Sequence, residues 1–199
     1  MATIKIIDNK ATSNRLMIGE NTLHFMGLQN GLDDDGKAVI MDEAMHVLGQ
    51  CIRPGINDNI TNIAVGYVQS GKTLSFTTLT ALAADNGWRV VVYLTGTKTN
   101  LQEQTSKRLQ KDLDIDNTDT YRMYTDIIDS VSVVNNARNF LKLSDEVLLF
   151  PILKHYKHIS RLANIFTQLR PELDGKGCII IDDEADQSSF NTYAKKNSQ

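Results

Sequence analysis

Residues 66–73 have the spacing of a loop that binds the phosphates of a nucleotide. Their sequence, GYVQSGKT, fits the pattern G-x-x-x-x-G-K-[S/T]. Small residues in such a loop let consecutive backbone N–H groups surround a triphosphate, and the following helix directs its positive end toward the same anion. We expect Lys72 to reach the outer phosphates and the Thr73 hydroxyl to hold a magnesium ion. The predicted nucleotide-binding residues are Gly66, Gln69, Ser70, Gly71, Lys72, Thr73 and Leu74. The alternative is a turn that binds no phosphate.

Four acids in five residues follow an apolar segment near the end of the sequence. Residues 178–181 read CIII, and residues 182–186 read DDEAD. An apolar strand that ends in Asp-Glu has the form of a Walker B motif, in which one carboxylate holds magnesium and the next accepts a proton from the attacking water. Either Asp182 or Asp183 could be the magnesium ligand; we prefer Asp183, with Glu184 as the general base. A solvated acidic loop is the alternative, but mutual repulsion of the carboxylates favours a bound cation.

Strands and helices are predicted to alternate from residue 60 onward. Strands are expected at residues 60–65, 88–95, 120–124, 146–152 and 178–181, and helices at residues 73–84, 99–111, 131–141 and 156–169. Thr99 and Gln102 have the spacing of a capping box at the start of one of these helices. Such alternation predicts an α/β fold with a mostly parallel sheet and helices on both faces. Both motifs would then lie at the carboxyl edge of the sheet, where ligands bind in this class of fold.

Residues 1–55 are expected to form a lead-in to a nucleotide-binding domain of residues 56–199. The first 36 residues are mixed and polar, and we expect irregular structure with a strand at 3–7. Apolar residues at helical spacing between Val39 and Cys51 predict a helix that ends by Arg53, because Pro54-Gly55 cannot continue it. The acidic run before this helix is interpreted as a solvated first turn rather than a metal site.

Composition and charge exclude several classes of protein. The chain has 199 residues, of which 41% are hydrophobic and 23% are charged, as in an ordinary soluble domain. The net charge of −3 gives no global attraction to nucleic acid or to an anionic membrane, so any polyanion site must be local. No secretory signal or bilayer-length apolar stretch is present, which predicts a cytoplasmic protein with no membrane partner. Cys51 and Cys178 are expected to be buried, reduced thiols.

The two motifs together resemble the first RecA-like domain of the superfamily-two helicases and translocases. Residues 65–73 (VGYVQSGKT), 94–97 (LTGT) and 181–189 (IDDEADQSS), with Asn191-Thr192, are more specifically similar to the Z-one-domain proteins. That family of helicase-like ATPases is associated with prokaryotic restriction and phage defence, and endonuclease activity has been ascribed to it. The resemblance covers roughly residues 60–192 and implies a RecA-like P-loop NTPase that binds ATP and Mg²⁺.

The resemblance also implies a nucleic-acid partner, with DNA favoured over RNA. In superfamily-two proteins, the loop after the strand that corresponds to residues 88–95 contacts the nucleic-acid backbone through small hydroxyl residues and main-chain N–H groups. In this chain that role would fall on Thr95, Gly96 and Thr97. A plain strand-to-helix turn is the alternative.

His155 and His158 have the spacing of a shared helix face, but no further ligand accompanies them. A surface pair is therefore favoured over a metal site.

Superfamily-two enzymes close a second RecA-like domain over the nucleotide, and that domain donates an arginine to the transition state. No such domain is present in these residues, and no nuclease signature is found outside the acids already assigned. We therefore expect this chain alone to bind ATP, to hydrolyse it slowly and to need a second domain or a partner subunit. Lys72, Asp183 and Glu184 are the predicted catalytic residues. The alternative function is a nucleotide-gated protein-interaction module with little turnover.

Overall fold

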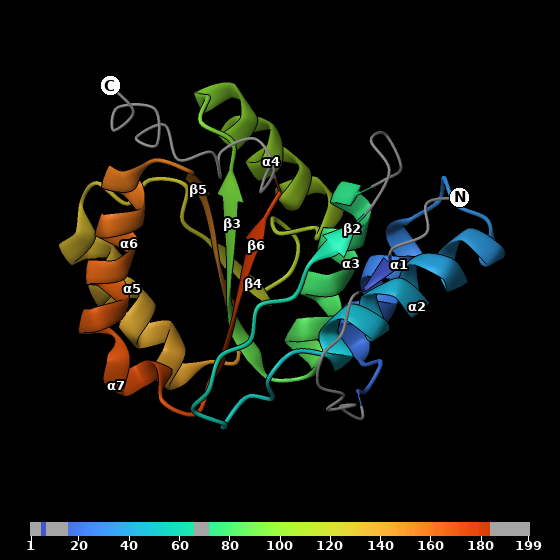
Figure 1. The fold of residues 1–199 in the computed structure, drawn as a ribbon, viewed down its shortest axis with the longest axis horizontal. Helices are drawn as coiled ribbons and strands as arrows, with labels where there is room; N and C mark the ends of the chain where they lie inside the picture. Colours follow the sequence, from blue (N-terminus) through green and yellow to red (C-terminus); the bar gives the residue numbers. More distant parts are fainter. Residues whose placement is uncertain (1–4, 7–15, 66–71, 184–199) are drawn as a thin grey trace, which may run out of the picture.

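The fold is organised around a four-stranded parallel sheet (Figure 1). A computed structural model describes residues 5–6, 16–65 and 72–183. The strand order is β4-β5-β3-β6, and every neighbouring pair is parallel. The strands are β3 (Trp88–Thr95), β4 (Tyr121–Met123), β5 (Val147–Leu153) and β6 (Gly177–Asp182). Because the strands are parallel, all four carboxyl ends lie at one edge of the sheet.

Helices cover both faces of this sheet, as the sequence predicts. On one face α3 (Lys72–Asp85) packs against Val91 and Ile179, together with α1 (Glu20–Leu28), α2 (Asp34–Gly49) and α4 (Thr99–Asp112). On the other face α5 (Ser130–Leu143) and α6 (Tyr156–Gln168) pack against Val92 and Phe150. A short helix, α7 (Arg170–Leu173), leads into β6. The α/β class and the parallel sheet are therefore confirmed.

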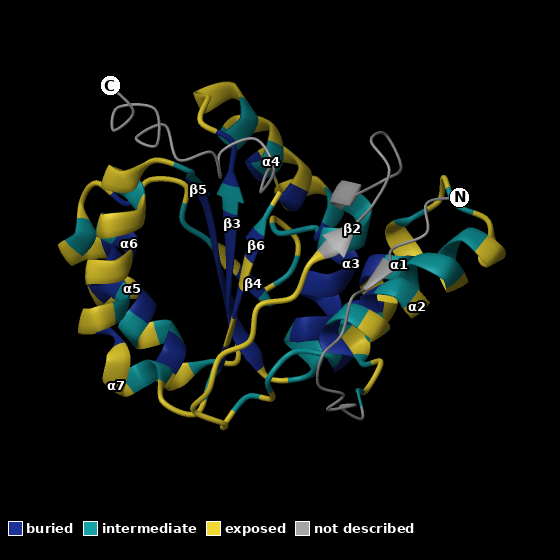
Figure 2. Cartoon of the chain, viewed as in Figure 1, coloured by how far each residue is buried: buried dark blue, intermediate teal, exposed yellow. Residues whose placement is uncertain are grey.

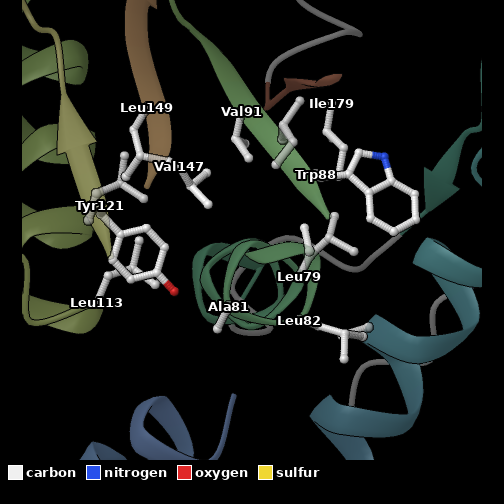
Figure 3. Packing of buried hydrophobic residues seen from close by; sticks show 14 of the residues in the cluster. Leu79, Ala81, Leu82, Trp88, Val91, Leu113, Tyr121, Val147, Leu149 and Ile179 are labelled. Carbon is white, nitrogen blue, oxygen red and sulfur yellow. The ribbon is translucent and has the colours of Figure 1, made fainter. Parts of the chain in front are cut away.

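The predicted elements from residue 88 onward are all present. Each strand lies within one residue of its expected bounds, and each helix within two. The apolar run of β3 is buried along almost its whole length, because it lies between β5 and β6 and is covered on both faces. Figure 3 shows Leu79 of α3 on the side of the helix that faces Val91 of the sheet, whereas Leu82 points toward α2. The apolar runs of the strands and the helical spacing of apolar residues in the helices made these elements predictable from the sequence.

The predicted capping box at the start of α4 is wrong. Lys98 is the residue that precedes the helix, and it makes no side-chain capping bond. The amide of Gln102 instead donates to the carbonyl oxygens of Pro151, at 2.8 Å, and Thr125, at 3.0 Å. Gln102 thus fastens α4 to β5 and to the segment after β4. Gln102 therefore makes tertiary hydrogen bonds in place of the local capping bond that the sequence pattern predicts.

The strand that precedes the phosphate-loop sequence differs from its prediction. A strand is expected at residues 60–65, but β2 comprises only Ala64–Val65. It pairs antiparallel with β1 (Lys5–Ile6) and belongs to a separate two-stranded sheet. Residues 56–63 are exposed, as the yellow segment leading to β2 in Figure 2 shows. Among the described residues, no strand therefore pairs with the outer edge of β6.

The amino-terminal helices are part of the main core. The acidic run forms the exposed first turn of α2, where the Asp33 carboxylate accepts from the N–H of Gly36 at 2.8 Å, as expected. The helix α1 was not predicted, since an irregular segment is expected there. Phe25 of α1 and Leu48 of α2 are nevertheless buried with the side chains of α3. The helices α1 and α2 therefore pack into the same core as α3.

The missed helix α1 depends on a distant carboxylate. Asp85, at the end of α3, accepts five hydrogen bonds from the first turn of α1, donated by Gly19 N, Asn21 N and Nδ2, and Thr22 N and Oγ1. The helix has no side-chain cap of its own. A carboxylate at this position satisfies N–H groups that would otherwise be unpaired and interacts favourably with the helix dipole. Asp85 therefore caps α1 from another helix.

Replacing Asp85 by Ala should destabilise the whole domain. We expect the free energy of unfolding to fall by roughly 2–4 kcal/mol, because several partly buried donors lose a charged acceptor. Urea unfolding followed by circular dichroism measures the change. Asp42→Ala, at an exposed position of α2, is the control and should shift the free energy by less than about 0.5 kcal/mol. Equal stability of the two variants would contradict the capping role of Asp85.

Candidate functional site

The first turn of α3 lies at the carboxyl edge of the sheet. Only Asn86 and Gly87 connect α3 to β3, so the helix runs antiparallel to the strand. Gly87 has φ +84°, a conformation that side-chain-bearing residues rarely adopt, which permits this tight turn. Near the other end, the Tyr93 hydroxyl contacts Thr80 of α3 and lies 3.5 Å from the carbonyl oxygen of Phe76. The start of α3 and the end of β6 therefore share one edge.

The predicted nucleotide loop is only partly within the described residues. Gly66, Gln69, Ser70 and Gly71 lie outside them, as does Glu184. The backbone of Lys72 and Thr73 forms the first turn of α3, the position that the motif requires. Leu74, the next residue, is half-buried and packs against the core.

A lysine directly after β5 forms a salt bridge with the first acid of the DDEAD sequence. Lys154 follows the last residue of β5, and its Nζ lies 2.7 Å from Oδ2 of Asp182. The strand β3 lies between β5 and β6, so this side chain bridges two strand spacings, roughly 10 Å. The side chains are 15% and 30% exposed, respectively, so water screens the pair only in part. Asp182 Oδ1 is buried and has no hydrogen-bond partner among the described residues.

The backbone of Lys154 is fixed at the same place. Its N–H donates to the carbonyl oxygen of Thr95 at 3.0 Å and lies 3.4 Å from that of Gly96. Lys154 therefore joins the carboxyl ends of β3, β5 and β6, through its backbone to β3 and through its side chain to β6. The sequence places Lys154 in a basic segment but does not predict this contact. A lysine directly after one parallel strand, with acids after another, is the signal that could have indicated it.

Asp183 differs from Asp182 in its surroundings. It is exposed, in the turn after β6, and its N–H lies 3.4 Å from the carbonyl oxygen of Leu94. Magnesium prefers carboxylate oxygens that can also leave room for several waters. Asp183 is exposed, whereas one oxygen of Asp182 contacts an ammonium group and the other is buried. The choice of Asp183 over Asp182 as the magnesium ligand stays a prediction.

A small pocket adjoins Asp183 between α4 and the carboxyl ends of β3 and β6. Its volume is about 190 Å³, and its lining residues are Thr95, Gly96, Leu101, Gln104, Thr105, Arg108 and Asp183. Pockets that enclose a nucleotide-sized ligand are typically 300–1,000 Å³. This pocket is therefore too small to be the nucleotide site by itself, although it lies beside the predicted magnesium ligand.

The basic segment after β5 forms an exposed face of α6. Residues 154–171 contain four Lys or Arg and two His but no Asp or Glu. Lys157 is exposed and Arg161 half-exposed, and neither forms a salt bridge with a described residue. Tyr156 is 67% exposed at the start of the helix. His155 caps this helix, since its Nδ1 lies 3.3 Å from the N–H of Lys157.

Comparison with known protein families, with curated proteins and with solved structures finds no match. Within residues 16–65 and 72–183, no helix is both long and apolar enough to cross a bilayer. The same residues contain no group of three or more His, Cys, Asp or Glu side chains arranged to hold a metal ion.

Cys178 is free and exposed, which corrects the expectation of a buried thiol.

The three residues predicted to contact nucleic acid do not share one environment. Thr95 is 3% exposed, and its hydroxyl donates to the carbonyl oxygen of Ile152 in the neighbouring strand at 3.0 Å. Gly96 is buried, whereas Thr97 is exposed. The Thr95 hydroxyl therefore has a structural bond, and of the two threonines only Thr97 presents its side chain to solvent.

Thr95→Val should separate the structural contribution of the hydroxyl from any ligand contact. We expect it to lower the free energy of unfolding by about 1–2 kcal/mol, because the Ile152 carbonyl loses its donor in a buried position. Thr97→Val, the matched change at an exposed residue, should have a negligible effect. Chemical denaturation of both variants tests this, and an unchanged stability in Thr95→Val would refute the assignment.

Proposed function

We propose that this chain is the ATP-binding, RecA-like domain of a helicase-like protein that acts on nucleic acid, with DNA favoured over RNA. The observation that carries the proposal is the convergence of two motifs at one sheet edge. Lys72 and Thr73 open α3, and the DDEAD sequence begins at the end of β6. Ligands of parallel α/β folds bind at the carboxyl edge of the sheet, which supports the proposal. The resemblance to Z-one-domain proteins supports a role in restriction or phage defence.

In this proposal the residues of the two motifs divide the work on one nucleotide. Lys72 and the N–H groups at the start of α3 bind the phosphates, because they present positive charge at a helix N-terminus. Asp183, with Thr73, would hold Mg²⁺, which neutralises phosphate charge and so assists attack by water. Glu184 would accept the proton of that water. A second RecA-like domain, or a partner subunit, would supply the arginine that this arrangement needs for rapid hydrolysis.

The nucleic-acid part of the proposal rests on the basic face of α6, defined by Tyr156, Lys157 and Arg161. This helix begins at the carboxyl edge, two residues after Lys154, which contacts Asp182. Lysine and arginine bind phosphates without sequence preference, and an exposed tyrosine can stack on a base. Because the net charge of the whole chain is −3, such binding would depend on a local basic face. A nucleotide-gated protein-interaction module is the alternative, and it predicts ATP binding without a nucleic-acid contact here.

Lys72→Ala should weaken ATP–Mg²⁺ binding by about tenfold to a hundredfold, the cost of removing one charge-assisted phosphate contact. Isothermal titration calorimetry of the chain with ATP and Mg²⁺ measures the affinity. The control is Lys111→Ala, which removes the same charge from the exposed far end of α4 and should bind ATP as the unmodified chain does. If Lys72→Ala and the unmodified chain have equal affinity, the ATP-binding proposal fails.

Reversing the charge on α6 should selectively reduce nucleic-acid binding. We expect the double variant Lys157→Glu/Arg161→Glu to bind single-stranded DNA more weakly and to lower the salt dependence of the affinity by about one phosphate contact per residue. Fluorescence anisotropy with a labelled oligonucleotide, at several salt concentrations, provides both quantities.

The double variant Lys107→Glu/Lys111→Glu is the matched control for this change. It has the same helical spacing, on α4, and the same change in net charge. An equal loss of affinity in both double variants would show a general charge effect and would contradict a local site on α6. The absence of any DNA binding by the unmodified chain, together with tight ATP binding, would favour the protein-interaction alternative.

A further inference from the structure

We propose that the outer edge of β6 is a docking site for a second copy of this chain, which pairs antiparallel with it through its own β6. The strand β6 is the last of the sheet, and no strand among the described residues pairs with its outer edge. Such pairing would join two four-stranded sheets into one continuous sheet across a twofold axis. The inference goes beyond the proposed function, since it needs neither nucleotide nor nucleic acid.

The sequence of β6 is that of a strand covered on both faces, but its position leaves one face open. Residues 178–181 read CIII, and continuous apolar runs are typical of parallel strands buried on both faces. In the structure Ile179 and Ile181 are buried in the core cluster that contains α3, whereas Cys178 is exposed and Ile180 is 62% exposed. An exposed apolar edge strand of this kind is a template for pairing with another chain.

The backbone of β6 presents hydrogen-bonding groups at the same edge. The N–H of Asp183 lies 3.4 Å from the carbonyl oxygen of Leu94 in β3, so the odd-numbered residues of β6 direct their backbone groups toward β3. Because successive residues of a strand direct these groups to alternate sides, those of Cys178, Ile180 and Asp182 point outward. An antiparallel partner strand can exchange pairs of hydrogen bonds with these residues.

The order of charges along β6 favours a second copy in the antiparallel orientation. Lys176 precedes the strand and Asp182 ends it, with apolar residues between them. A register centred on Ile179 places Lys176 of one copy opposite Asp182 of the other, and Cys178 opposite Ile180. Every side chain on the exposed face then lies beside an oppositely charged or an apolar one, and such cross-strand pairs stabilise a ladder. A parallel arrangement would instead place like charges together.

The interface would be small, and we expect a weak dimer. Strands of six residues bury much less than the roughly 1,200–2,000 Å² of a stable complex. Asp182 already contacts Lys154 within its own copy, at 2.7 Å, so Lys176 adds little to the affinity. The charge of Lys176 sets the orientation and register of the strands, while the backbone ladder and Ile180 supply most of the attraction.

Sedimentation velocity of the full chain at increasing concentration tests the association. We expect the apparent mass to rise from 22.2 kDa toward twice that value and to stop there, because a twofold pair uses the outer edge of β6 in both copies. Ile180→Lys should remain monomeric where the unmodified chain is dimeric, and should keep its melting temperature because the side chain is exposed. Ile128→Lys is the matched control, since this isoleucine is 67% exposed before α5, and it should dimerise normally.

Disulfide cross-linking tests the register and does not need Ile180→Lys to fold. Cys178 of one copy and residue 180 of the other should lie directly opposite, with Cβ atoms roughly 5 Å apart, close enough for a disulfide after a small adjustment. Under mild oxidation, Ile180→Cys should therefore form a covalent dimer on a non-reducing gel. The unmodified chain and the double variant Ile180→Cys/Cys178→Ser should not, because this register places no two of their cysteines opposite each other.

Four outcomes would overturn the inference. A chain that stays monomeric at every concentration would show that the edge does not pair with a second copy. A dimer that persists in Ile180→Lys, or is lost equally in Ile128→Lys, would place the contact elsewhere. Association that continues beyond the dimer would exclude a closed twofold pair. Equal cross-linking of Ile180→Cys with and without Cys178 would exclude the register centred on Ile179.

Discussion

The parallel pairing of β5, β3 and β6 is the constraint on which the candidate site depends. Because the three strands run in the same direction, segments that are distant in the sequence emerge at one edge. Thr95, Lys154 and Asp182 meet there although each belongs to a different strand end. An antiparallel β5 would place Lys154 at the opposite edge of the sheet. The ion pair with Asp182 would then be impossible.

The packing of α3 on β3 orients the other half of the site. A two-residue connection turns the chain back, so the start of α3 reaches the edge where β3 ends. The opposite end of α3 holds α1 through Asp85, and the buried side chains of α1, α2 and α3 form one cluster. The helix α3 is therefore joined to β3 by a short connection and to α1 by the carboxylate of Asp85.

The sequence predicted much of the fold but not every connection within it. Long apolar runs such as β3 and strongly periodic segments such as α6 were placed correctly, because their burial pattern is encoded locally. The helix α1 was missed, since its cap is the carboxylate of Asp85 on another helix. The capping box predicted from Thr99 and Gln102 is wrong for the same reason. The amide of Gln102 donates instead to carbonyl oxygens that are distant in the sequence.

The sequence by itself determined the chemical types at the site, namely a GKT sequence before a helix and a DDEAD sequence after an apolar strand. It also determined that both belong to an alternating α/β chain. Only the tertiary structure distinguished Asp182, which is held by Lys154, from the exposed Asp183, and showed that the Thr95 hydroxyl is committed to Ile152. The physical reason is that each distinction depends on a partner from another strand. Side-chain spacing along one segment carries no information about which strand lies beside it.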